Sequence, residues 1–260
     1  MRKSVEVDMN NFMKKWGLTL NVLVIVFVLL VIKWLIDMYN LNAATASPLV
    51  TALVGGVIFT IAIIFTGTLT DYKESEKIPG ELAASIKALY KDSGIIRVDD
   101  GQITEDLRSH IIDMLRIINA NFKNNVWELE KINSAMDAID GDIKRLAEKG
   151  VAPQFLVKLR TELINIDRTS NRVRTIAETT FIPAAYGIAE LAVGAVLLVL
   201  LFVKTEPYYE GLVLIGATSS LLIGLIMLIK DMDNPFEVGK KTYADVDLSL
   251  LFNLEDYLKK

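Results

Sequence analysis

The side chains best suited to chemistry in this sequence are its carboxylates, and their spacing matches no catalytic or metal-binding motif. Asp231 and Asp233 precede Pro235 as at the start of a calcium loop, yet the glycine turn and distal glutamate of an EF-hand are missing. His110 is the only histidine and cysteine is absent, which excludes a multi-histidine metal site and a cysteine nucleophile within one chain. No phosphate loop, dinucleotide fingerprint or nucleophile elbow occurs. We therefore expect no enzyme, no catalytic residues, no metal site and no cofactor.

A few ionisable side chains occur in or beside long apolar segments or helical patterns. Lys33 and Asp37 are four residues apart, which favours an ion pair with Lys33 extending to the membrane surface; a role in a pore is the alternative. Glu190 lies about two turns inside its segment, so we expect it to face protein or water. His110 is expected on a partly exposed helix surface, with pH sensing as the alternative.

Four segments contain most of the apolar residues, and each is long enough to cross the ~30 Å hydrocarbon core as a helix of ~20 residues. They comprise residues 18–35, 48–68, 182–203 and 211–229. In lipid, a helix is the structure in which one segment bonds all of its own backbone amides. The sequence therefore predicts an all-α membrane protein with four transmembrane helices in two hairpins.

The distribution of lysine and arginine predicts the orientation of these helices. Basic residues precede the first segment, recur through the middle region and follow the last segment, whereas the loop at 38–47 contains none. By the positive-inside rule, both termini and the middle region are cytoplasmic. The net charge is only −4 and no extended basic run occurs, so we expect no binding to nucleic acid.

The region between the hairpins is predicted to be a cytoplasmic helical bundle. Its first helix is expected to continue from the second membrane helix through 70–92, a stretch with few helix-breaking residues. Thr104 is expected to cap a second helix, Gly150 to close a third, and Pro153 to begin the last. The predicted organisation is an N-terminal cytoplasmic segment at 1–17, hairpin 1 at 18–69, the cytoplasmic domain at 70–180, hairpin 2 at 181–230, and a C-terminal cytoplasmic segment at 231–260.

Two motifs resemble the bestrophin family of ion channels, as does the order of the helices over nearly the whole chain. Residues 181–186 are similar to the Ile-Pro-x-x-Tyr start of that family's third membrane helix, and an acidic–Pro–Phe motif follows the fourth. The matching residues are Pro183, Tyr186, Asp231, Asp233, Asn234, Pro235 and Phe236. The chain departs from the family at Thr70, Asp71 and Tyr72, where arginine and tryptophans are usual. The acidic run of animal members is missing after Phe236, which argues against activation by calcium.

The resemblance implies a homopentamer in the plasma membrane, with one central pore for small inorganic ions. It places a hydrophobic neck on the second membrane helix and a second, cytoplasmic constriction at Gln154 or Phe155. The implied neck residues are Val54, Ile58 and Ala62. Because these three are spaced by four residues they share one helix face, and apolar rings of this kind can gate by dewetting. The neighbouring face is the competing assignment, and it comprises Val57, Ile61 and Phe65.

The sequence leaves the conducted ion and even conduction itself open. Chloride is slightly favoured because the best-known family members conduct anions, whereas Glu206 and Glu210 near the outer mouth favour a monovalent cation. A non-conducting, membrane-anchored scaffold or signalling protein is a further hypothesis. It rests on the second helix having no polar stripe beyond Thr51, Thr60 and Thr66. A flagellar-stator-like proton channel subunit has the same order of helices but requires a partner protein.

Overall fold

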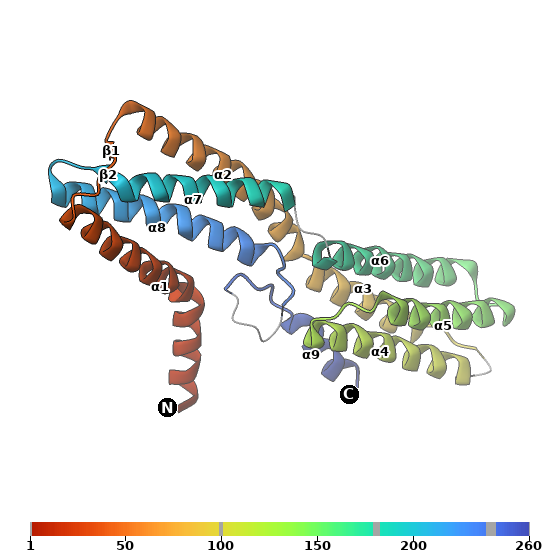
Figure 1. Ribbon diagram of the computed structural model, residues 1–260. Coiled ribbons are helices and arrows are strands. Elements are labelled where there is room, and N and C mark those ends of the chain that lie inside the picture. The colour runs from red at the N-terminus through yellow and green to blue at the C-terminus, as the bar shows by residue number, and fades with distance from the viewer. Residues whose placement is uncertain (1, 99–100, 179–182, 238–242, 260) are drawn as a thin grey trace. The chain divides into compact units, whose positions relative to one another are not determined.

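The computed structural model describes residues 2–98, 101–178, 183–237 and 243–259, and side chains from residue 15 onward (Figure 1). These residues form two compact units. We call one the membrane unit; its described residues run up to 70 and include 183–233 and 243–244. The other, the polar unit, contains the described residues of 71–178 together with 234–237 and 245–259. The predicted domain boundary at 180–181 lies outside the described residues.

The membrane unit is built from long apolar helices. Its elements are α1 (Arg2–Met38), β1 (Ala44–Thr45), most of α2 (Pro48–Ser75), α7 (Pro183–Phe202), β2 (Val203–Lys204) and α8 (Tyr208–Met232). The described part of the chain has four helices whose length and composition allow them to cross a membrane, which confirms the predicted all-α membrane class. The short strands β1 and β2 pair in parallel, and no sequence pattern predicted them.

Packing in the membrane unit leaves much apolar surface facing outward. A small core joins α2, α7 and α8 through Ile61, Val196 and Leu222, which are fully buried. Large side chains such as Phe27 and Leu191 are more than half exposed. Such exposure is unfavourable in water but costs nothing against lipid tails, which are equally apolar. The helices that α1 contacts most are α8 and α7, so its main packing partners come from the far end of the chain.

The polar unit is an ordinary amphipathic helical assembly. It contains α3 (Ile78–Ser93), α4 (Gly101–Asn124), α5 (Leu129–Glu148), α6 (Pro153–Glu178) and α9 (Ser249–Leu258). The helices α3 and α6 pack together, as do α4 and α5, and α5 and α6. Each buries apolar residues that recur at helical spacing, for example Leu107, Ile111 and Leu115 in α4. This core is the largest continuous apolar cluster of the described residues.

Two predicted features of the polar unit are wrong, and two are confirmed. The chain does not continue as one helix through 70–92, because α2 ends at Ser75 and α3 begins at Ile78. Pro79 explains the break, since its ring would clash with the carbonyl of Ser75 in an unbroken helix. Thr104 is not a cap but lies inside α4, which begins at Gly101. The backbone of Gly150 has φ +76° just after α5, and α6 begins at Pro153, as expected.

Asp140 connects α5 to α6 and supplies a pH-dependent part of the stability. It accepts hydrogen bonds from Lys144 at 2.8 Å and from Arg160 at 2.8 Å. The hydrogen bond from Lys144, with a further one from Arg160, lowers the pKa of Asp140 below its usual value of about 3.9. A carboxylate whose pKa is lower in the folded state stabilises the fold above the unfolded-state pKa. That stabilisation is lost as the pH falls through the folded-state pKa.

We therefore expect Asp140→Asn to lower the free energy of unfolding at pH 7 by at most about 1 kcal/mol, because the pair is partly exposed. The deficit should shrink as the pH is lowered below about 4. Urea unfolding of the detergent-solubilised chain, followed by far-UV circular dichroism, measures both values. Asp137→Asn, at an exposed carboxylate on the same helix, is the control and should change little. A deficit that is independent of pH would contradict the assignment.

Candidate functional site

The faces of α2, the predicted neck helix, differ in how much of their surface is exposed. Val57 and Ile61 of the competing face are 6% and 0% exposed, because they pack against α7 and α8 within the same chain. A side chain enclosed by its own chain cannot face a pore, so these two positions are unsuitable for a neck. Val54 and Ile58 are partly buried at the edge of that core, and Ala62 is exposed.

Sequence reasoning missed how exposed one neighbouring strip of α2 is. Phe59 is 68% exposed and Ile63 is 59% exposed, and both lie next to the predicted face. Gly55 and Gly56 are also open, since no atom of the described chain lies within 4 Å of a Cβ placed on either. In the sequence these residues look like any others in a uniformly apolar segment. Their exposure depends on which side of α2 the helices α7 and α8 cover.

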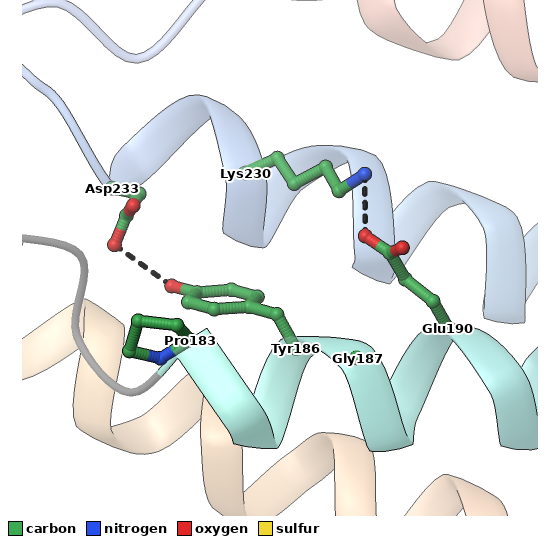
Figure 2. A pocket seen from close by; sticks show the side chains of 6 residues that line it. All are labelled: Pro183, Tyr186, Gly187, Glu190, Lys230 and Asp233. Carbon is green, nitrogen blue, oxygen red and sulfur yellow. Dashed lines mark hydrogen bonds and ion pairs between the residues drawn. The ribbon is translucent and has the colours of Figure 1, made fainter.

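Two of the motif residues, Tyr186 and Asp233, are hydrogen-bonded to each other at one end of α7 (Figure 2). The hydroxyl of Tyr186 donates a hydrogen bond to Asp233 Oδ1 at 2.9 Å and lies 3.4 Å from Thr68 Oγ1 of α2. Tyr186 is buried, and Asp233 is the C-cap of α8. The contact therefore ties α7 to the end of α8 and to α2. The motif residues Phe181 and Ile182 that precede it lie outside the described residues.

Glu190 is paired, and this agrees with its expected location beside protein or water. Its carboxylate lies 2.5 Å from Lys230 Nζ of α8, as Figure 2 shows. The two side chains are 44% and 56% exposed, and with Pro183 and Gly187 they line an open cavity of about 420 Å³. Lys230 directly follows the apolar segment of α8, so the pair lies near the end of the membrane helices, where charges are tolerated.

The other motif residues serve the local fold. One oxygen of Asp231 accepts hydrogen bonds from the backbone N–H groups of Tyr243 and Ala244, at 2.8 and 2.6 Å. In the polar unit, Phe236 is buried with its ring centroid 5.7 Å from that of Phe122. Val246 donates its backbone N–H to the carbonyl of Pro235 at 2.9 Å. Among the described residues no group of three or more histidine or carboxylate side chains has the arrangement of a metal site.

Lys33 contradicts the expectation that its ammonium group reaches the membrane surface. The side chain is 1% exposed and donates to Asp37 at 2.5 Å, Asn42 at 3.1 Å and the carbonyl of Val203 at 2.7 Å. Three acceptors replace the water that snorkelling would otherwise supply. The predicted ion pair with Asp37 is confirmed. What the sequence concealed is the carbonyl of Val203, which the fold brings from the other end of the chain.

The remaining candidate residues lie on the surface of the polar unit. Gln154 and Phe155, the predicted second constriction, are exposed in the first turn of α6. His110 is partly exposed, as expected, and its Nδ1 lies 2.6 Å from Asp142 Oδ2 of α5. The buried carboxylate of Asp142 also binds Arg145, so the histidine belongs to a hydrogen-bonded network between α4 and α5.

Comparisons with known proteins identify the fold. No protein-family model matches the chain, and no curated protein matches it in sequence. Solved structures do match. A variant of a bacterial bestrophin homologue from Klebsiella pneumoniae aligns with a TM-score of 0.72 and 12% identity, over 94% of this chain and 97% of that one. Another structure of that homologue has a TM-score of 0.72 and 12% identity, over 93% and 96% of the two chains.

A further structure, described only as a membrane protein, has a TM-score of 0.76 at 12% identity, over 92% of this chain and 96% of that one. At such identities the matches show the fold. The chain therefore has a bestrophin-like fold, as its motifs implied.

Proposed function

We propose, from the bestrophin-like fold of the chain, that it is an ion channel. The proposed assembly is a homopentamer in the plasma membrane, with both termini in the cytoplasm and one central pore for small monovalent ions. The observation that carries the proposal is the match to a bacterial bestrophin homologue over 94% of this chain. The four helices suited to crossing a membrane support it.

We assign the hydrophobic neck to Val54, Ile58 and Ala62 of α2. The burial of Val57 and Ile61 supports this face over its competitor. Apolar rings hold water weakly, so a narrow neck of this kind can pass from wet to dry with a small change in radius. Gln154 or Phe155 forms the second constriction, and their exposure at the start of α6 is compatible with that role.

Chloride is the ion that we favour, with a monovalent cation as the alternative. Glu206 and Glu210 were the arguments for a cation, and the carboxylate of Glu206 lies 2.9 Å from Lys204 Nζ. A lysine beside a carboxylate reduces its attraction for cations, so this exposed pair weakens the contribution of Glu206, though not that of Glu210, to a cation-selective mouth.

One observation favours the non-conducting scaffold as a second candidate. The hydroxyls of Thr51, Thr60 and Thr66 each donate to a carbonyl four residues earlier, at 3.3, 2.9 and 2.8 Å. Hydroxyls bonded within their own turn of helix offer less polarity to ions than free ones. The surface of α2 is therefore even less polar than its sequence suggests.

Planar bilayers containing the purified protein, in asymmetric potassium chloride, test the proposal. We expect currents whose reversal potential lies toward the equilibrium potential of chloride; a shift toward that of potassium would favour the cation alternative. Native mass spectrometry should give the mass of five copies of the 28.9 kDa chain. A silent monomer or dimer would contradict the channel and favour the scaffold, and a co-purified partner would favour the stator-like alternative.

A further inference from the structure

The chain that follows α8 returns to the membrane unit at Tyr243 and Ala244. The backbone N–H groups of these two residues donate to the same oxygen of Asp231, Oδ2, at 2.8 and 2.6 Å. Asp231 lies in the last turn of α8, which ends at Met232. Hydrogen bonds to a charged acceptor are about twice as strong as those between neutral groups. Asp231 therefore fastens residues 243–244 to the end of α8.

The side chain of Tyr243 reaches the start of α1. Its hydroxyl accepts a hydrogen bond from Nδ2 of Asn21 at 3.0 Å. One turn earlier in α1, Gly17 is buried, and a Cβ placed on it would overlap Cε1 of the Tyr243 ring. A ring can approach a helix this closely only at a residue that has no Cβ. Gly17 thus provides the space in which the ring lies.

The ring lies at the end of an interface that direct contacts between α1 and α8 form elsewhere. Leu30 of α1 lies 3.4 Å from a Cβ placed on Gly216 of α8, and Val22 lies 3.8 Å from one placed on Gly224. These two pairs show that the helices are antiparallel, with the start of α1 beside the end of α8. At the start of α1, by contrast, the nearest atoms belong to Tyr243. The ring therefore connects the two helices where they do not meet directly.

The attachment to α1 is weaker than the attachment to α8. Residues 243–244 are held on α8 by two charge-assisted bonds, whereas the bond to Asn21 joins two neutral groups. Asn21 is exposed and Tyr243 is partly exposed, so water and lipid headgroups compete for that bond. When the ring leaves α1, Asp231 still holds the backbone that carries it.

We propose that Asp231, Tyr243 and Ala244 form a latch, which stays fastened to α8 while the ring of Tyr243 leaves and rejoins the start of α1. With the ring in place, the latch holds the start of α1 against the end of α8. With the ring released, that part of α1 can move, while contacts such as Val22 with Gly224 keep the rest of the helix in place. The inference concerns two helices of one chain and does not depend on conduction.

Fluorine NMR of the full-length, detergent-solubilised protein labelled with 3-fluorotyrosine tests the contact with α1. The chain has eight tyrosines, and the resonance of Tyr243 is the one that Tyr243→Phe removes. Gly17→Ala should shift this resonance toward that of free fluorotyrosine in water, because the added Cβ occupies the space of the ring. Asn21→Leu removes the hydrogen-bond donor and should shift it in the same direction. Thr19→Leu, at another exposed polar residue of α1, should leave it unchanged.

Hydrogen exchange of the backbone amides of Tyr243 and Ala244, followed by mass spectrometry, tests the attachment to α8. Gly17→Ala should leave this exchange nearly unchanged, because Asp231 still holds both N–H groups. Asp231→Asn should accelerate it about tenfold, the effect of replacing a charged acceptor by a neutral one. The latch is overturned by an unshifted Tyr243 resonance in Gly17→Ala, by equal shifts in Asn21→Leu and Thr19→Leu, or by equal acceleration of exchange in Gly17→Ala and Asp231→Asn.

Discussion

Replacing Ala62 by phenylalanine should abolish the current, because five rings would then project into the proposed neck. Ala62 is exposed on α2, so the larger side chain can be accommodated without disturbing the core of its own chain. Replacing the same residue by serine should preserve or increase the current. A hydroxyl at this position makes the neck easier to wet and lowers the barrier that apolar rings impose.

Single-channel recordings in bilayers measure both effects, after native mass spectrometry has shown that each variant still assembles. Ala195→Phe is the matched control, since it adds the same ring at an exposed alanine of α7. This control should conduct like the unchanged protein. Full current through Ala62→Phe, or an equal block by Ala195→Phe, would show that Ala62 does not line the neck.

Replacing Lys33 by methionine should cost about 3–5 kcal/mol of unfolding free energy, the usual cost of removing one partner of a buried ion pair. The substitution leaves Asp37 with an unpaired charge, and its Oδ2 is already buried without a partner among the described residues. It also removes the hydrogen bonds to Asn42 and to the carbonyl of Val203. Unfolding by denaturant in detergent micelles measures the loss.

Two further variants show whether burial is the cause. Lys33→Met combined with Asp37→Leu removes both charges and should recover most of the lost stability, since an apolar pair can replace a buried ion pair. Lys204→Met breaks an ion pair whose side chains are 60% and 79% exposed, and it should leave stability almost unchanged. Similar losses in Lys33→Met and Lys204→Met would show that the Lys33 pair contributes no more than a surface pair.

The bestrophin-like fold was predictable because it is encoded in short stretches of sequence and in the order of the helices along the chain. The length of an apolar segment decides whether it can cross a membrane, and neighbouring residues such as Gly150 and Pro153 decide where helices end or begin. The prediction from local sequence failed where a helix-breaking residue lies among good helix formers. The run after residue 70 has good helix formers, but Pro79 outweighs them and separates α2 from α3.

The candidate sites were less predictable, because they depend on residues that are far apart in the sequence. Tyr186 and Asp233 belong to two motifs that the sequence could identify, but their hydrogen bond required α7 and α8 to pack together. The contact between Lys33 and the carbonyl of Val203 gave no sequence signal at all, because these residues meet only when α1 packs against α7 and α8.

Taken alone, the sequence determined that four helices suit a membrane, that cysteine chemistry is excluded, and which fold the motifs resemble. These conclusions depend on composition, segment length and the order of residues along the chain. Only the tertiary structure decided that Lys33 is buried and that Glu190 pairs with Lys230. It also decided that α7 and α8 cover Val57 and Ile61 of α2 while Phe59 stays exposed. A uniformly apolar helix has no sequence pattern that distinguishes its faces, and its neighbours in the fold decide which face is covered.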